Sequence, residues 1–155
     1  MSTAGSGTTP ASADRFELKY HHGGISVPDL EASIAWYGEV LGFRVEERIN
    51  IDAIPAKIAM LRRGNMRMEL FEVPNAAPAA EDRRHPNRDI LTHGNKHVAF
   101  AVQDVHTAAD ELKRRGADIV WVRDFEFGSN AFIRDNAGNL IELVQQPELW
   151  RDGSS

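Results

Sequence analysis

One pattern occurs twice in the sequence, and this repetition constrains the fold more than any other feature. The segment HHGGISVPDLEASIAWY at residues 21–37 matches KHVAFAVQDVHTAADEL at residues 96–112. In each copy a histidine opens an apolar strand, which runs into a helix capped by an aspartate, Asp29 or Asp104. A glycine then ends each helix, at Gly42 and Gly116. The repetition therefore predicts two modules of the same architecture.

Strand patterns follow each predicted helix in the same order. Three alternating or apolar runs follow the first helix and three follow the second, so each half reads βαβββ. The sequence predicts an α+β fold of two tandem βαβββ modules. The predicted divisions are a disordered tail at 1–14, a first module at 15–73, a linker at 74–95, a second module at 96–146 and a C-terminal tail at 147–155.

Composition narrows the classes of partner and of site. The 155-residue chain has a formal net charge of −5 and no basic run, which disfavours nucleic acid as a partner. It has no cysteine, so any metal must be held by His, Asp or Glu. No stretch approaches the roughly 20 apolar residues that cross a membrane, and the first residues lack the pattern of a signal peptide. These features predict a soluble, cytoplasmic protein.

Each module contains one histidine and one glutamate at corresponding places. His22 and Glu69 lie in the first and last predicted strands of the first module, 47 residues apart, and His97 and Glu142 lie 45 residues apart in the second. Strand alternation places each histidine on the face that carries small residues. Each glutamate interrupts an otherwise apolar strand, where a carboxylate is costly unless it is paired or bound to a metal.

The four side chains together form a donor set for a divalent first-row metal. Softness favours Zn, Ni, Co, Mn or Fe(II) over harder ions. For each residue taken singly, an ordinary strand position is the better interpretation. The matching places in the two modules favour ligands, and the sequence predicts a metal site made of His22, Glu69, His97 and Glu142.

Three segments resemble signature segments of the vicinal oxygen chelate superfamily. They are HHGGISVPDLEASIAWYGEVLGF, KHVAFAVQDV and FIRDNAGNLIELV, and the similarity covers Leu18 to Gln146. This superfamily includes glyoxalase I, methylmalonyl-CoA epimerase, extradiol dioxygenases and antibiotic-resistance proteins. The resemblance implies paired modules whose mixed sheet curls around a metal-binding cavity, in a homodimer. It also maps the superfamily's metal positions onto the same four residues.

The resemblance further implies a reaction through an enolate or enediolate of a small oxygen-rich substrate. Glu142 matches the carboxylate that serves as base in glyoxalase I-like enzymes, and Glu69 is the second candidate carboxylate. Methylmalonyl-CoA epimerases add a carboxylate from the third strand of the first module. Lys57 stands at or near that place, as a candidate acid or substrate clamp or as a solvated strand residue. This departure weakens a strict match to that enzyme.

Other functions and structural roles stay open at this point. An Fe(II) ring-cleaving dioxygenase would use His22, His97 and Glu142, but Glu69 would then occupy a position needed by oxygen or substrate. A non-catalytic drug or metabolite binder is a third class. The aromatic residues Trp121, Phe125 and Phe127 are candidates for a pocket wall or for packing. The sequence leaves open whether the four ligands come from one chain or two, and whether glutathione or CoA is involved.

Overall fold

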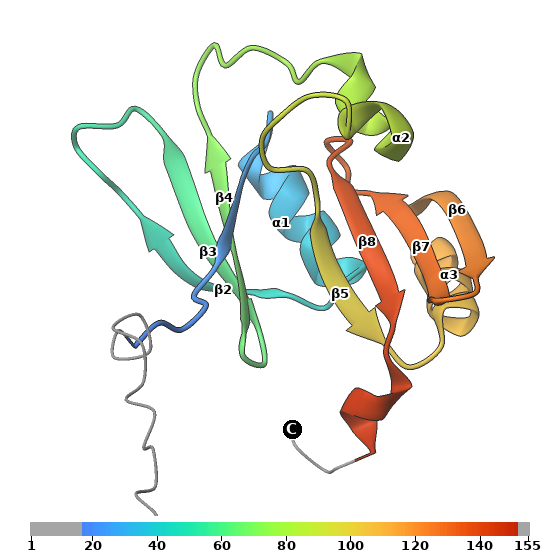
Figure 1. The fold of residues 1–155 in the computed structure, drawn as a ribbon. Coiled ribbons are helices and arrows are strands. Elements are labelled where there is room, and N and C mark those ends of the chain that lie inside the picture. Colours follow the sequence, from blue (N-terminus) through green and yellow to red (C-terminus); the bar gives the residue numbers. More distant parts are fainter. Residues whose placement is uncertain (1–16, 152–155) are drawn as a thin grey trace, which may run out of the picture.

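The computed structural model of the chain describes residues 17–151, and within them two modules follow one another (Figure 1). The predicted tail at 1–14 lies outside the described residues. The first module consists of β1 (Gly23–Ser26), α1 (Leu30–Glu39), β2 (Arg44–Ile49), β3 (Lys57–Arg63) and β4 (Met66–Glu72). The second consists of β5 (Val98–Val102), α3 (Val105–Arg114), β6 (Asp118–Phe125), β7 (Gly128–Arg134) and β8 (Leu140–Gln145). The predicted α+β fold of two βαβββ modules is confirmed.

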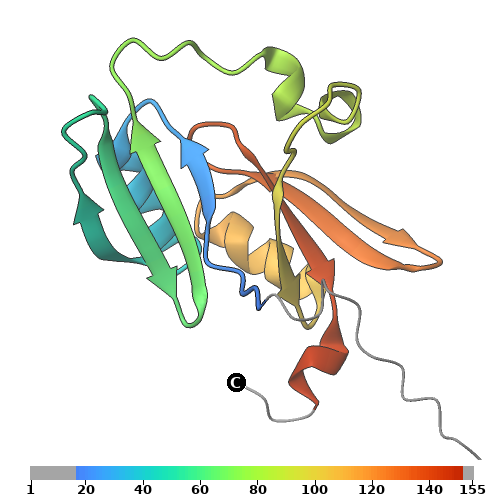
Figure 2. The ribbon, with the colours of Figure 1, turned by 60° about the vertical axis from the view of Figure 1, so that its left-hand side comes forward.

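The strands form two separate four-stranded mixed sheets. Their orders are β1-β4-β3-β2 and β5-β8-β7-β6, so the two modules have the same topology. In each sheet the first strand pairs in parallel with the last, and the remaining pairs are antiparallel. Figure 2 shows the two modules as two distinct sheets next to each other, and they do not close into one barrel.

The aspartates predicted as caps begin the two long helices. The Asp29 carboxylate accepts a hydrogen bond from the Ala32 backbone N–H at 2.9 Å, and Asp104 accepts one from Thr107 at 2.7 Å. Each satisfies a backbone donor that the first helical turn leaves without a partner. Gly42 and Gly116 follow the helices with φ values of 73° and 94°, a backbone conformation that glycine adopts at little cost.

A shared core joins the two modules. Met68 and Leu70 of β4 are buried, and so are Ile141 and Leu143 of β8; all four belong to one cluster that includes apolar residues of both α1 and α3. Glu69 and Glu142 alternate with these residues and therefore point away from the core. Both glutamates therefore lie on the faces of the sheets opposite the helices. Among the described residues, no helix is long and apolar enough to span a membrane.

The structure differs from the sequence prediction in the connecting segments. The predicted linker contains η2 (Glu81–Arg84) and α2 (Pro86–Asp89), and the C-terminal segment contains η3 (Pro147–Trp150). Each has only four residues, which is too short to produce a helical period in the sequence. Strand β1 begins at Gly23, where its pairing with β4 starts.

A buried hydrogen bond between Tyr37 and Asp135 connects the modules. The Tyr37 hydroxyl of α1 donates to the Asp135 carboxylate at 3.1 Å, in the turn before β8. Asp135 also accepts from the backbone N–H groups of Ala137 and Asn139 and from the Asn139 side chain. Burial, with the charge of Asp135 and this hydrogen bond, raises the pKa of Tyr37 well above its ordinary value. Tyr37 therefore remains a donor throughout the physiological pH range.

We expect Asp135→Ala to lower the free energy of unfolding by about 2–4 kcal/mol, because it leaves several buried donors without an acceptor. Tyr37→Phe removes one donor and keeps the turn, so we expect a loss of about 1 kcal/mol. Urea denaturation of both variants measures the difference. Equal losses would contradict the role assigned to Asp135.

Candidate metal centre

The first histidine–glutamate pair lies at the start of β1. Glu69 of β4 stands opposite Gly24 in the parallel register, and His22 lies two residues before Gly24 on the same face. The His22 Nε2 atom is 3.2 Å from Glu69 Oε2. On the other side of the ring, His22 Nδ1 is hydrogen-bonded to His21 Nδ1 at 2.6 Å. His21 thus orients the His22 ring with Nε2 toward the carboxylate.

The second pair repeats this geometry in the second module. Glu142 of β8 stands opposite Ala99, and His97 lies two residues before Ala99. The His97 Nε2 atom is 3.0 Å from Glu142 Oε2. The Asn130 side-chain amide donates to the other carboxylate oxygen, Oε1, at 2.8 Å. Both carboxylate oxygens of Glu142 are therefore held in place.

Both pairs fit the donor set of a divalent metal. Ligand atoms bound at about 2.0–2.2 Å to one ion lie about 3 Å apart at neighbouring positions. The nitrogen-to-oxygen distances of 3.2 and 3.0 Å match that spacing, and the two glutamate side chains are only 17% and 19% exposed. His22, Glu69, His97 and Glu142 are therefore arranged as two pairs of ligands, with one pair in each module.

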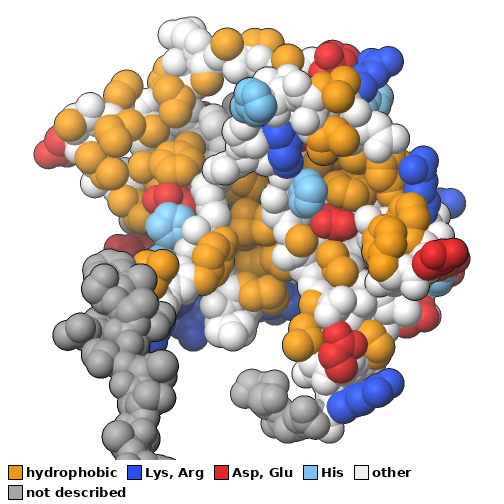
Figure 3. Space-filling view, in the orientation of Figure 1, with side chains coloured by type: hydrophobic (Ala, Val, Ile, Leu, Met, Phe, Trp, Pro, Cys, Tyr) orange, Lys and Arg blue, Asp and Glu red, His pale blue; other side chains and the backbone are white. Residues whose placement is uncertain are grey.

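The structure does not bring the four predicted ligands into one cluster. Within residues 17–151, no group of three or more His, Asp or Glu side chains is arranged to hold a metal ion. His22 and His97 both line a groove of about 610 Å³ between β1 and β5, whereas the two glutamates do not line it. In the space-filling view, histidine and carboxylate surfaces adjoin in two places on this face, with a hollow between them (Figure 3). One chain therefore presents two half-sites.

Comparison with known proteins identifies the family of the chain. The family description "Glyoxalase/Bleomycin resistance protein/Dioxygenase superfamily" matches residues 19–143. The chain belongs to this superfamily.

Relatives within the superfamily include an epimerase and a lyase. The chain is 26% identical over 137 residues to mitochondrial methylmalonyl-CoA epimerase of Homo sapiens, covering 82% of this chain and 73% of that protein. It is 24% identical over 146 residues to lactoylglutathione lyase of Pseudomonas aeruginosa, covering 83% of each. Among solved structures, a glyoxalase family protein from Enterococcus faecalis superposes with a TM-score of 0.69 at 23% identity, covering 81% of this chain and 96% of that one.

The structure places Lys57 away from the two pairs, which fits the solvated strand residue among its expected roles rather than an acid or a substrate clamp. Lys57 lies on the same face of β3 as Ala59 and Leu61, whose side chains belong to the core cluster, and so on the opposite face of the sheet from Glu69. Its ammonium group donates to Glu72 Oε1 at 2.7 Å. Glu72 also accepts from the Leu30 backbone N–H at the start of α1. Lys57 therefore supports the beginning of a helix.

Sequence reasoning missed Asn130 and His21, which hold the two pairs in position. The sequence shows Asn130 as a polar residue in the predicted strand before that of Glu142. Its contact with Glu142 could not be predicted, because it depends on the register of β7 against β8. His21 gave no separate signal, because only the structure shows that it turns toward its neighbour. Each of the two residues hydrogen-bonds to a candidate ligand and is not itself a candidate ligand.

We expect Lys57→Met to leave metal binding by the protein unchanged, since Lys57 touches none of the four candidate ligands. The hydrogen bond from Lys57 is the main cause of the lowered pKa of Glu72, so that pKa should rise in the variant. A lowered carboxyl pKa stabilises the fold above the unfolded-state pKa, and this stabilisation is lost as pH falls through the folded-state pKa. The variant should therefore lose stability at neutral pH and converge with the wild type in acid. Urea titrations across this range and metal analysis test both statements, and loss of metal would place Lys57 in the site.

Proposed function

We propose that this superfamily member is a metal-dependent isomerase, epimerase or lyase that acts on a small oxygen-rich substrate through an enolate-type intermediate. The observation that carries the proposal is the repeated pairing of His22 with Glu69 and of His97 with Glu142, at ligand spacing. The relatives named methylmalonyl-CoA epimerase and lactoylglutathione lyase support this range of reactions.

The four paired side chains would hold the metal, which is Zn, Ni, Co, Mn or Fe among the ions that suit imidazole and carboxylate donors. When bound, a divalent ion supplies Lewis-acid stabilisation of negative charge on adjacent substrate oxygens. The chain itself contributes the orientation of these donors and a partly enclosed surrounding.

Glu142 is the candidate base. Its Oε2 atom faces His97, its Oε1 atom accepts from Asn130, and the side chain is 19% exposed. A carboxylate so placed can take a proton from a substrate carbon and return it. Glu69 is the corresponding carboxylate of the other half-site. No other hydrogen bond to its side chain is present within the described residues, so Glu69 is free to exchange partners.

A homodimer completes the site in this proposal. Within residues 17–151 the two pairs of one chain do not form a cluster of three or more donors, so a second chain would supply the missing pair. A two-fold axis places the same surface of each chain against its partner. The first module of one chain then faces the second module of the other, and the dimer contains two complete sites.

The ring-cleaving dioxygenase remains the second enzyme class. It requires two histidines and one carboxylate with open positions for oxygen and substrate. Glu69 lies 3.2 Å from His22, as a fourth donor in the set. This contact favours the isomerase, epimerase or lyase.

We expect wild-type protein purified without a metal-affinity tag to contain close to one equivalent of divalent metal per chain. His97→Ala and Glu142→Ala should lose most of it, because each removes one donor of a half-site. Inductively coupled plasma mass spectrometry measures the metal content. His106→Ala is the matched control, since His106 is exposed and pairs with Asp124, away from the four candidate ligands.

Retention of metal in both site variants would contradict the assigned ligands. Absence of metal in folded, reconstituted wild-type protein would contradict the chelate mechanism and favour a non-catalytic binder.

The dimer proposal predicts complementation between inactive chains. A His22→Ala/Glu69→Ala chain and a His97→Ala/Glu142→Ala chain should each bind no metal alone. After unfolding, mixing and refolding, half of the dimers are mixed and each has one intact site, so about a quarter of the wild-type metal content should return. No recovery in mixtures shown to contain mixed dimers would contradict a site shared between two chains.

A further inference from the structure

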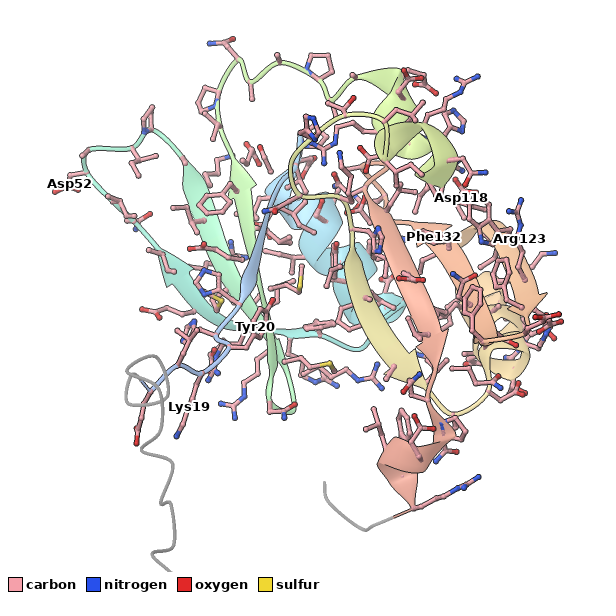
Figure 4. All side chains as sticks on the ribbon, viewed as in Figure 1. Lys19, Tyr20, Asp52, Asp118, Arg123 and Phe132 are labelled. Carbon is pink, nitrogen blue, oxygen red and sulfur yellow. The ribbon has the colours of Figure 1, made fainter. Side chains whose placement is uncertain are left out.

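A small pocket lies beside His97 in the second module. It encloses about 300 Å³, between the open face of β6 and β7 and the segment around α2. Phe132 packs its ring edge against both His97 and Trp121, with ring centroids 4.9 and 5.2 Å apart. Figure 4 shows Phe132 and Arg123 on this module, with Tyr20 at the start of β1 in the other. The volume lies at the lower end for small-molecule sites.

Three buried polar atoms of the pocket residues have no hydrogen-bond partner within the described part of the chain. They are Trp121 Nε1, Asn130 Oδ1 and Asp89 Oδ2. The first is a donor and the other two are acceptors. A buried polar atom without a partner costs about 1–3 kcal/mol, so three among the residues of one cavity favour a bound group that supplies the missing partners.

Asp89 is the most informative of the three. It is 2% exposed, and its Oδ1 atom faces two cations, Lys96 Nζ at 3.4 Å and Arg83 Nε at 3.5 Å. Its Oδ2 atom faces no partner within residues 17–151. One oxygen therefore has its charge compensated by the protein, whereas the other lacks a hydrogen-bond donor within the described residues.

We propose that this pocket binds the substrate as a small, neutral ring that carries several hydroxyl groups. A hydroxyl group both donates and accepts, so a few of them can serve the Trp121 N–H, the Asn130 carbonyl and the Asp89 carboxylate. The aromatic walls suit the C–H face of such a ring. An apolar ring would leave all three polar atoms unpaired, and a free carboxylate could pair with Arg123 of the lining but not with the acceptors Asn130 and Asp89.

Asn130 joins this pocket to the candidate base. Its Nδ2 atom donates to Glu142 Oε1, and its Oδ1 atom is the unpartnered acceptor. A hydroxyl bound to Oδ1 would therefore lie one side chain away from Glu142. The inference rests on the proposed function in naming the ligand as the substrate, but none of the three pocket atoms belongs to a candidate metal ligand.

The test is binding followed by the Trp121 indole N–H signal in ¹H–¹⁵N spectra, assigned by its loss in Trp121→Phe. The probes are myo-inositol, D-glucose and D-xylose, with cyclohexanol as the apolar ring and quinate as the carboxylated ring. The protein is the full chain treated with a chelator, so binding is measured without metal or turnover. This measurement therefore distinguishes failure of the pocket proposal from failure of the metal proposal.

We expect at least one polyol to shift the Trp121 signal saturably at up to tens of millimolar, with cyclohexanol and quinate about tenfold weaker or silent. Asp89→Asn should weaken polyol binding about tenfold, while Asp82→Asn, an exposed acid of the same segment, should bind as the wild type does. If Asp89→Asn perturbs the fold, the Asn130 side-chain signals of the wild-type protein provide a second measure of polyol binding. No shift with any polyol, or equal binding of cyclohexanol or quinate, would overturn the proposal.

Discussion

The arrangement of this molecule depends on two carboxylates placed in otherwise apolar strands. Glu69 and Glu142 lie between buried neighbours, where an unpaired charge would be costly. The parallel pairing of the first and last strands of each module solves this, because it places a histidine two residues before the position opposite each glutamate. The same backbone register in two modules thus produces the same donor pair twice. The small residues Gly24 and Ala99, opposite the glutamates, keep that face open.

Most of the fold follows from short-range patterns in the sequence. The Asp29 and Asp104 caps, the glycines after the helices and the strand alternation are local signals, and the structure confirms them. The two short helices of the linker were not predicted, because four residues are too few to show a helical period. The separation of the strands into two sheets could not be predicted. Whether the edge strands of two modules pair with each other leaves no local pattern in the sequence.

The site was predicted less completely than the fold. Each histidine and its glutamate lie together as their matching places suggest, but the two pairs lie apart within one chain. Which pair joins which depends on how modules pack, and the shared core that decides this is assembled from residues distant in sequence. Lys57 shows the same limit: its position in the strand was read correctly, whereas its face of the sheet depends on the register with Glu72. Asn130 and Asp89 became visible only through the hydrogen bonds that they make and lack.

Two half-sites, one in each module, account for the proposed chemistry and for the proposed dimer together. The most direct measurement is a crystal structure of the metal-loaded protein with anomalous diffraction data collected on either side of the metal absorption edge. The account predicts one strong anomalous peak per chain, bound by His97 and Glu142 of one chain and by His22 and Glu69 of another. A peak bound by other residues, or no peak at these four side chains in metal-loaded crystals, would contradict it.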